Sequence, residues 1–199
     1  MRKALAMAVI MLFVGATTAM AQVSGTAHNM NTYITAEGGT PETNEVCIYC
    51  HAPHNRADYA LWNRTNNAGG DYTPYTSPTI DMTIGNPGDA SLGCLSCHDG
   101  TLGVEAFTGF TLGTGPYNIT GAANVGQNLT DDHPVGVTYD PGQDADFDLA
   151  VNLAIAQLYG PSGDQVECAS CHDPHDNTFG SFLVASNANS AICVDCHLK

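Results

Sequence analysis

The chain of 199 residues is long enough for one ordinary domain, and 43% of its residues are hydrophobic. Only 8% are aromatic, while 21 glycines and 10 prolines interrupt the apolar runs, so the chain is too rich in loops to be stabilised by its own side chains alone. The formal net charge of −15 argues against nucleic acid and anionic membrane surfaces as partners. We therefore expect something other than side chains to fill the interior.

Residues 1–21 have the pattern of a secretory signal peptide. Arg2 and Lys3 give it a charged start, the following run is uncharged, and Ala19-Met20-Ala21 is a small-x-small cleavage site. The apolar run is short for a transmembrane helix, and we expect no membrane anchor. Cleavage would leave residues 22–199, with three basic and twenty acidic residues and a net charge of −17. We expect a secreted protein, extracellular or at the cell surface, with the periplasm as the alternative.

Every cysteine belongs to one of four Cys-x-x-Cys-His motifs. They are Cys47-Ile48-Tyr49-Cys50-His51, Cys94-Leu95-Ser96-Cys97-His98, Cys168-Ala169-Ser170-Cys171-His172 and Cys193-Val194-Asp195-Cys196-His197. Eight cysteines in an exported chain would ordinarily indicate disulfides, but neither disulfide nor zinc frameworks require a histidine after each pair. The pattern is that of c-type haem attachment, in which two thiols bond the vinyl groups and the histidine binds the iron. The sequence therefore predicts four covalent haems, with proximal ligands His51, His98, His172 and His197.

Four histidines remain outside the motifs, namely His28, His54, His133 and His175. Their number matches the sixth coordination positions of four haem irons. Only Met30 and Met82 remain as methionines after signal removal, so methionine cannot serve all four haems. We therefore expect four bis-histidine haems. Because such haems leave no open position for a substrate, we expect an electron-transfer protein and not an enzyme.

His54 and His175 each stand three residues after a proximal histidine, in the strings CHAPH and CHDPH. Such a residue lies on the proximal side of its own haem, so we expect it to bind a neighbouring haem. The simplest assignment pairs His54 with the haem of His98, His175 with that of His197, His133 with that of His172, and His28 with that of His51.

The order of the motifs repeats along the chain. An upstream histidine, a CxxCHxPH string and a plain CxxCH motif occur twice, which predicts duplicated two-haem units at 22–98 and 131–199. Residues 99–167 are rich in turn-forming residues, except that the apolar spacing over 146–159, before Gly160-Pro161, predicts a helix. The predicted fold class is a low-regularity multihaem cytochrome c wrap, with short helices and loops around four haems and little sheet.

Four short strings resemble the exported multihaem c-type cytochromes of metal-reducing bacteria. They are Ser24-Gly25-Thr26-Ala27-His28-Asn29, the stretch 45–55, Leu61-Trp62-Asn63-Arg64 and Asp132-His133-Pro134-Val135. By haem number, size and histidine inventory the chain is most similar to the tetrahaem OmcE-type cytochromes, which polymerise into extracellular nanowires. The resemblance implies a continuous haem stack through a filament, with one histidine ligand donated between subunits.

His28 is the candidate for that donated ligand, because it lies near the start of the mature chain on a polar segment able to reach a neighbour. The alternative is that His28 binds a haem of its own chain. Two other functions share the motifs. A diffusible periplasmic tetrahaem carrier would need no ligand from a neighbour, whereas a multihaem reductase would need one haem with an exchangeable position.

Overall fold

The computed structural model describes residues 22–54, 59–64, 72–107 and 117–198, so the predicted signal segment lies outside the described residues. Its helices and strands are short. In chain order they are η1 (Val23–Gly25), α2 (Met30–Ala36), α3 (Asp89–His98), η2 (Gly121–Ala123), β1 (Val137–Thr138), η3 (Ala150–Asn152), β2 (Gln165–Val166), α4 (Cys168–Cys171), η4 (Ala188–Ser190) and α5 (Cys193–Cys196). This agrees with the predicted low regularity and small amount of sheet.

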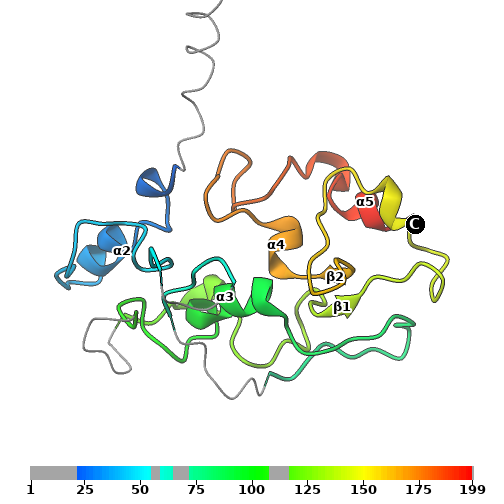
Figure 1. Ribbon diagram of the computed structural model, residues 1–199, viewed down its shortest axis with the longest axis horizontal. Coiled ribbons are helices and arrows are strands. Elements are labelled where there is room, and N and C mark those ends of the chain that lie inside the picture. The colour runs from blue at the N-terminus through cyan, green and yellow to red at the C-terminus, as the bar shows by residue number, and fades with distance from the viewer. Residues whose placement is uncertain (1–21, 55–58, 65–71, 108–116, 199) are drawn as a thin grey trace, which may run out of the picture.

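The α-helices follow one another along the molecule. In Figure 1, α2 lies near one end of the long axis and α5 near the other, with α3 and α4 between them. Helices α3 and α4 are in contact, and β1 pairs with β2 in an antiparallel sheet in which Val137 faces Val166. Within the described part of the chain, no helix is long and apolar enough to cross a membrane.

Apolar side chains gather in three small clusters and not in one large core. The first surrounds Met30, Ile34, Tyr49, Val104 and Phe107; the second, Tyr72, Leu95 and Leu129; the third, Met82, Val137 and Tyr139. Met30 and Met82 are therefore packed in apolar clusters, each only 6% exposed. Their burial agrees with histidine, and not methionine, as the distal ligand.

The helix predicted over 146–159 is wrong. Only the 3-10 turn η3 forms there, and Leu149 before it is extended, with φ −67° and ψ 140°. The carboxylate of Asp195 accepts the backbone N–H groups of Ala154, Ile155 and Ala156 at 2.8–3.0 Å. These N–H groups would otherwise donate within the helix, so a tertiary contact replaces the helical bonds that the apolar spacing predicts.

A hairpin returns the chain onto the first motif. His51 forms an antiparallel bridge with Trp62, and the N–H of Ala52 donates to the carbonyl oxygen of Leu61 at 2.9 Å. Ala60 and Leu61 at its turn have φ of 50° and 52°, a left-handed conformation that L-residues adopt at some cost. The hairpin thus fixes the backbone around the histidine of the motif.

The same hairpin follows the third motif, position by position and without insertion. His172 forms an antiparallel bridge with Leu183, and Asp173 N–H donates to the Phe182 carbonyl oxygen at 2.8 Å. Ser181 and Phe182 have φ of 48° and 55°. The repeated hairpin supports the predicted duplication, whose unit boundaries at 22–98 and 131–199 stay a prediction.

Candidate haem-binding site

Three of the four motifs share a closed helical turn. The histidine N–H donates to the carbonyl oxygen of the first cysteine, from His51 to Cys47 at 2.8 Å, from His172 to Cys168 at 3.1 Å and from His197 to Cys193 at 2.9 Å. The remaining motif forms the last turn of α3. All eight cysteines are free thiols. Each motif therefore presents two thiols within about one turn of helix and directs the histidine away at its end.

Three of the four proximal histidines are held in one tautomer. Nδ1 lies 2.7 Å from the Ala60 carbonyl oxygen in His51, 2.6 Å from that of Ala123 in His98 and 2.9 Å from that of Ser181 in His172. A carbonyl oxygen can only accept, so Nδ1 carries the proton and Nε2 keeps its lone pair. This is how proteins orient a histidine that binds a metal through Nε2.

Three distal histidines lie opposite three proximal ones. The ring centroids are 6.1 Å apart for His28 and His98, 6.0 Å for His51 and His175, and 6.4 Å for His133 and His197. Two imidazoles that bind one metal from opposite sides, with metal–nitrogen bonds of about 2 Å, place their centroids about 6 Å apart. The chain thus fits the group that the motifs imply.

The simplest pairing derived from the sequence is therefore wrong. His28 lies opposite His98 and not His51, while His175 lies opposite His51 and not His197. The physical reason is that the upstream histidine packs beside the plain CxxCH motif of its own unit, whereas the histidine of CHDPH crosses to the other unit. As the sequence predicts, His175 does not serve the motif that carries it.

His28 and His175, the distal histidines of the first two pairs, are both oriented by residues 173–174. Nδ1 of His28 lies 3.2 Å from the carbonyl oxygen of Pro174, and Nδ1 of His175 lies 3.2 Å from the carboxylate of Asp173. Burial lowers the pKa of His28, as do the nearby His98, His175 and His172, although the bond to Pro174 opposes them. A lowered pKa favours the neutral imidazole, which is the form that binds a metal.

His28 is held by its own chain. Besides the bond to Pro174, its ring packs at 4.1 Å against Phe182, and the N–H of Gln22 donates to the carbonyl oxygen of His175 at 3.1 Å. The segment from Gln22 to His28 is therefore anchored to the rest of the chain, unlike the free segment that the sequence suggested. This geometry favours His28 as a ligand within its own chain.

The fourth proximal histidine has a different setting. His172 is exposed, and among the described residues no aromatic ring lies opposite its imidazole. His54, the remaining distal candidate, is likewise exposed and stands in the first hairpin where His175 stands in the second.

The thiols of successive motifs are neighbours. Cys50 and Cys97 pack against the same apolar cluster, and burial, reinforced by Cys97, raises the pKa of Cys50 to about 12. A hydrogen bond between Cys94 and Cys168 raises the pKa of Cys94 and lowers that of Cys168. Burial and then Cys193 raise the pKa of Cys171. The motifs therefore follow one another in space in the order of the sequence.

Two residues that join neighbouring motifs were missed from the sequence. Glu167, only 2% exposed, accepts hydrogen bonds from the Ser91 hydroxyl and from Gly88 N–H, the latter at 3.0 Å. The Ser91 hydroxyl in turn accepts Cys168 N–H at 2.8 Å, and a Cβ on residue 88 would overlap Glu167. This network fastens α3 to α4, and the one available signal was the position of Glu167 directly before the third motif.

Arg64 is the second missed residue. It is 5% exposed and its guanidinium donates to the carbonyl oxygens of Ser96, Gly103 and Val104 at 3.0, 2.8 and 2.7 Å. The Trp62 indole donates to the Ser96 hydroxyl at 3.2 Å. The stretch 61–64, noted from the sequence only for its resemblance, thus connects the first hairpin to the second motif.

Comparison with known proteins finds one family relationship. Residues 160–199 match the family model of the doubled CXXCH motif, and this stretch contains the third and fourth motifs of the chain. No curated protein matches the chain, so the resemblance to the OmcE-type cytochromes stays a prediction. The match, the free thiols and the opposed histidines together indicate a multihaem c-type cytochrome that binds its haem covalently.

Proposed function

We propose that the protein transfers electrons through four covalently bound c-type haems, each with two histidine ligands. Haem, when bound, supplies reversible one-electron chemistry at its iron. The observation that carries the proposal is the placement of three distal histidines opposite three proximal ones, at 6.0–6.4 Å between ring centroids. With both axial positions filled by protein, no position is open to a substrate, which supports electron transfer and not catalysis.

The spatial order of the motifs supports a continuous path. Cys50 lies near Cys97, Cys94 lies near Cys168, and Cys171 lies near Cys193. Because each pair belongs to consecutive motifs, the four attachment points form one row. Short gaps between successive cofactors are what rapid electron transfer requires.

Electron paramagnetic resonance of the oxidised native protein tests this proposal. We expect low-spin signals only, and no binding of carbon monoxide by the reduced protein. A high-spin signal equivalent to one haem per chain, together with carbon monoxide binding by assembled protein, would replace the proposal with an enzyme that has an open haem.

We further propose that the protein is the subunit of an extracellular conductive filament. His172 supports this, since its imidazole is exposed and oriented by the Ser181 carbonyl oxygen at 2.9 Å. The repeated hairpin indicates which residue would supply this distal ligand. His54 occupies the position from which His175 serves the other unit, so His54 of a neighbouring subunit would serve His172.

An apolar end of the molecule also favours self-association. Leu149 and Val151 are 59% and 84% exposed, and Val194 and Leu198 are 56% and 58% exposed. Their segments are joined, because Leu198 N–H donates to the Asp146 carbonyl oxygen at 2.8 Å. Exposed apolar side chains grouped in this way are typical of interaction surfaces, and a second copy would cover them.

Mixing subunits tests the trans ligand. His54→Ala should leave one haem per chain high-spin and prevent filaments, and added wild-type subunits should restore low-spin ligation on the variant chains. His133→Ala is the matched control, because His133 faces His197 of its own chain and wild-type subunits cannot repair it. If mixing fails to repair His54→Ala while wild-type filaments form normally, the trans ligand is excluded.

A diffusible periplasmic carrier is the second candidate function. The attachment of His28 and Gln22 to the segment 174–175 of their own chain favours it, as does the repulsion between subunits of charge −17. Sedimentation of the native protein at high concentration separates the two functions. A monomer with four low-spin haems identifies the carrier, and a sedimenting polymer identifies the filament.

A further inference from the structure

The carboxylate of Asp173 contacts a distal histidine directly. Its Oδ1 lies 3.2 Å from Nδ1 of His175 and also accepts the backbone N–H of His175 at 2.9 Å. When Nε2 of His175 binds an iron, Nδ1 carries the proton, and an ionised carboxylate can only accept it. The contact is then a charge-assisted hydrogen bond, which is stronger than a bond between two neutral groups.

Five other histidines of the predicted ligand set have neutral acceptors instead. In each of them Nδ1 lies 2.6–3.2 Å from a backbone carbonyl oxygen; the five are His28, His51, His98, His133 and His172. A carbonyl oxygen carries only a partial charge, whereas the Asp173 carboxylate carries a full negative charge. The charge of its acceptor therefore distinguishes His175 from these five ligands.

The hairpin itself does not require this carboxylate. Ala52 stands in the first hairpin where Asp173 stands in the second. The N–H of Ala52 donates to the Leu61 carbonyl oxygen at 2.9 Å. In the same way, the N–H of Asp173 donates to the Phe182 carbonyl oxygen at 2.8 Å. Because the same backbone forms with an alanine at this position, the contribution of the carboxylate is its contact with His175.

We propose that Asp173 is a positioning residue that lowers the midpoint potential of the first haem, the haem bound between His51 and His175. A hydrogen bond from Nδ1–H to a carboxylate raises the basicity of the imidazole, and a more basic ligand stabilises oxidised iron more than reduced iron. The negative charge acts in the same direction, because it opposes the addition of an electron. This inference rests on the proposed function, since it requires a haem iron between the two histidines.

A lower potential at the first motif influences the path of electrons. Cys50 of the first motif and Cys97 of the second pack against the same apolar cluster, so the two attachment sites are neighbours. An electron at a site of lower potential moves more readily to the next site. The carboxylate of Asp173 therefore favours transfer from the first motif toward the second.

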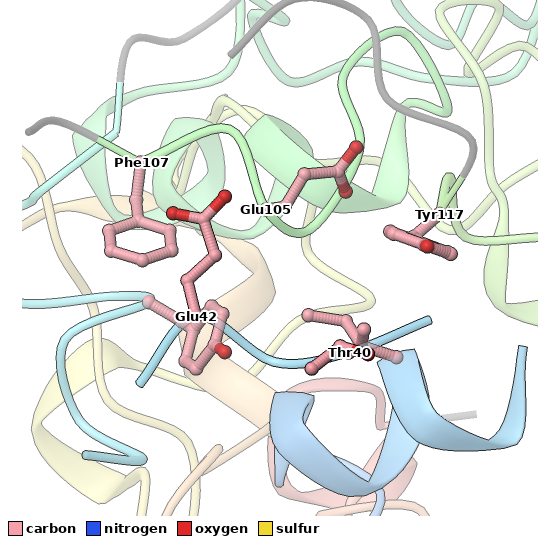
Figure 2. A pocket seen from close by; sticks show the side chains of 7 residues that line it. Thr40, Glu42, Glu105, Phe107 and Tyr117 are labelled. Atoms are coloured by element: carbon pink, nitrogen blue, oxygen red, sulfur yellow. The ribbon is translucent and has the colours of Figure 1, made fainter. Parts of the chain in front are cut away.

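Glu42 offers a control for the effect of charge alone. Its side chain is exposed and lines a pocket together with Tyr49, which stands between the two cysteines of the first motif. Figure 2 shows the Glu42 side chain at the wall of this pocket. The Nδ1 atoms of His51 and His175 have other partners. Glu42 thus places a negative charge near the first motif without orienting either ligand.

Redox titration of the haem-loaded protein tests the proposal. Asp173→Asn keeps an oxygen that accepts both N–H groups of His175 and removes only the charge. One midpoint potential should rise. The ratio of reduced to oxidised haem at a fixed applied potential should increase about twofold to fivefold, as for an exposed charge pair, which corresponds to about 20–40 mV for a one-electron couple. Glu42→Gln, and Asp176→Asn at an exposed position of the same hairpin, should shift that potential less.

Removal of the first haem identifies the iron on which Asp173 acts. In Cys47→Ala with Cys50→Ala, the further change Asp173→Asn should leave the remaining midpoint potentials unchanged. A rise in that background would overturn the proposal, because Asp173 would act on another haem.

Electron paramagnetic resonance separates the failure of this inference from the failure of the proposed function. If every haem is low-spin and Asp173→Asn raises no potential, or raises it no more than Glu42→Gln does, the role of Asp173 is refuted and the proposed function stands. A high-spin haem in Asp173→Asn would also refute this role, since the charge would then be needed to keep His175 bound. A high-spin haem in the wild type would instead contradict the proposed function.

Discussion

The imidazole rings of His51 and His175 face each other at 6.0 Å between centroids, with an angle of 20° between their planes. One ring belongs to the first motif and the other to the CHDPH string of the third. If both rings bind one haem iron as proposed, the two predicted units complete each other, since the proximal ligand lies in one unit and the distal ligand in the other.

This relationship predicts which haem is opened by removal of His175. His175→Ala should convert one haem per chain to high spin, about a quarter of the haem content. Cys47→Ala with Cys50→Ala gives a protein that lacks the first haem. In that background His175→Ala should add no high-spin signal, because the iron that His175 is expected to bind is absent. Electron paramagnetic resonance measures the high-spin signal in both backgrounds. His133→Ala in the background without the first haem is the control, because it should still convert one haem to high spin. An added signal from His175→Ala there would assign His175 to another iron.

The sequence alone names the candidate ligands, but it does not predict which histidines the fold brings together. CxxCH is a local chemical pattern, so its cysteines and histidines are identified without knowledge of the fold. Which distal histidine meets which proximal one depends on contacts such as His28 with Pro174, which join segments far apart in the chain. The repeated hairpins could have been suspected from the two CxxCHxPH strings, but the paired left-handed residues in them, Ala60 and Leu61 in one and Ser181 and Phe182 in the other, are not glycines and so do not reveal the turns.

The number of covalent haems follows from the thiols. All eight cysteines are free, and under the proposed function each pair would form two thioether bonds with one haem. The intact mass of the secreted protein should equal residues 22–199 plus four haems, and Cys193→Ala with Cys196→Ala should lower it by one haem. A mass with fewer haems, or with the two-hydrogen losses of disulfides, would contradict the count of four.

Arg64 should be essential for stability and not for haem chemistry. Arg64→Met removes the side-chain donor to the carbonyl oxygens of Ser96, Gly103 and Val104, of which Gly103 still accepts the N–H of Ala106, and should lower the free energy of unfolding by about 3 kcal/mol. Arg64→Lys keeps the positive charge but loses the planar guanidinium. Its free energy of unfolding should lie between those of the wild type and Arg64→Met. Guanidinium titration followed by far-ultraviolet circular dichroism measures the loss. If the unfolding midpoint of Arg64→Met equals that of the wild type, the hydrogen bonds of the guanidinium do not stabilise the fold.

The helix predicted over 146–159 is replaced by contacts with Asp195, whose carboxylate can be titrated. Asp195 accepts three backbone N–H groups from 154–156. Burial alone would raise its pKa, but these donors outweigh burial and hold the pKa below its usual value. Asp195 lies inside the fourth motif, so it also ties the last haem attachment site to the loop that packs on it.

The lowered pKa fixes the sign of the pH dependence. A carboxylate whose pKa is lower in the folded state stabilises the fold above its unfolded-state pKa, near 4, and this contribution is lost as the pH falls through the folded-state value. Asp195→Asn should therefore cost about 1–2 kcal/mol at pH 7, and the gap from wild type should shrink as the pH falls below about 4. Asp131→Asn, at an exposed position, is the control and should change little at either pH. Guanidinium unfolding at pH 7 and at pH 3 measures the gap. A cost that is the same at both pH values would mean that shape, and not the negative charge of Asp195, holds the loop at 154–156.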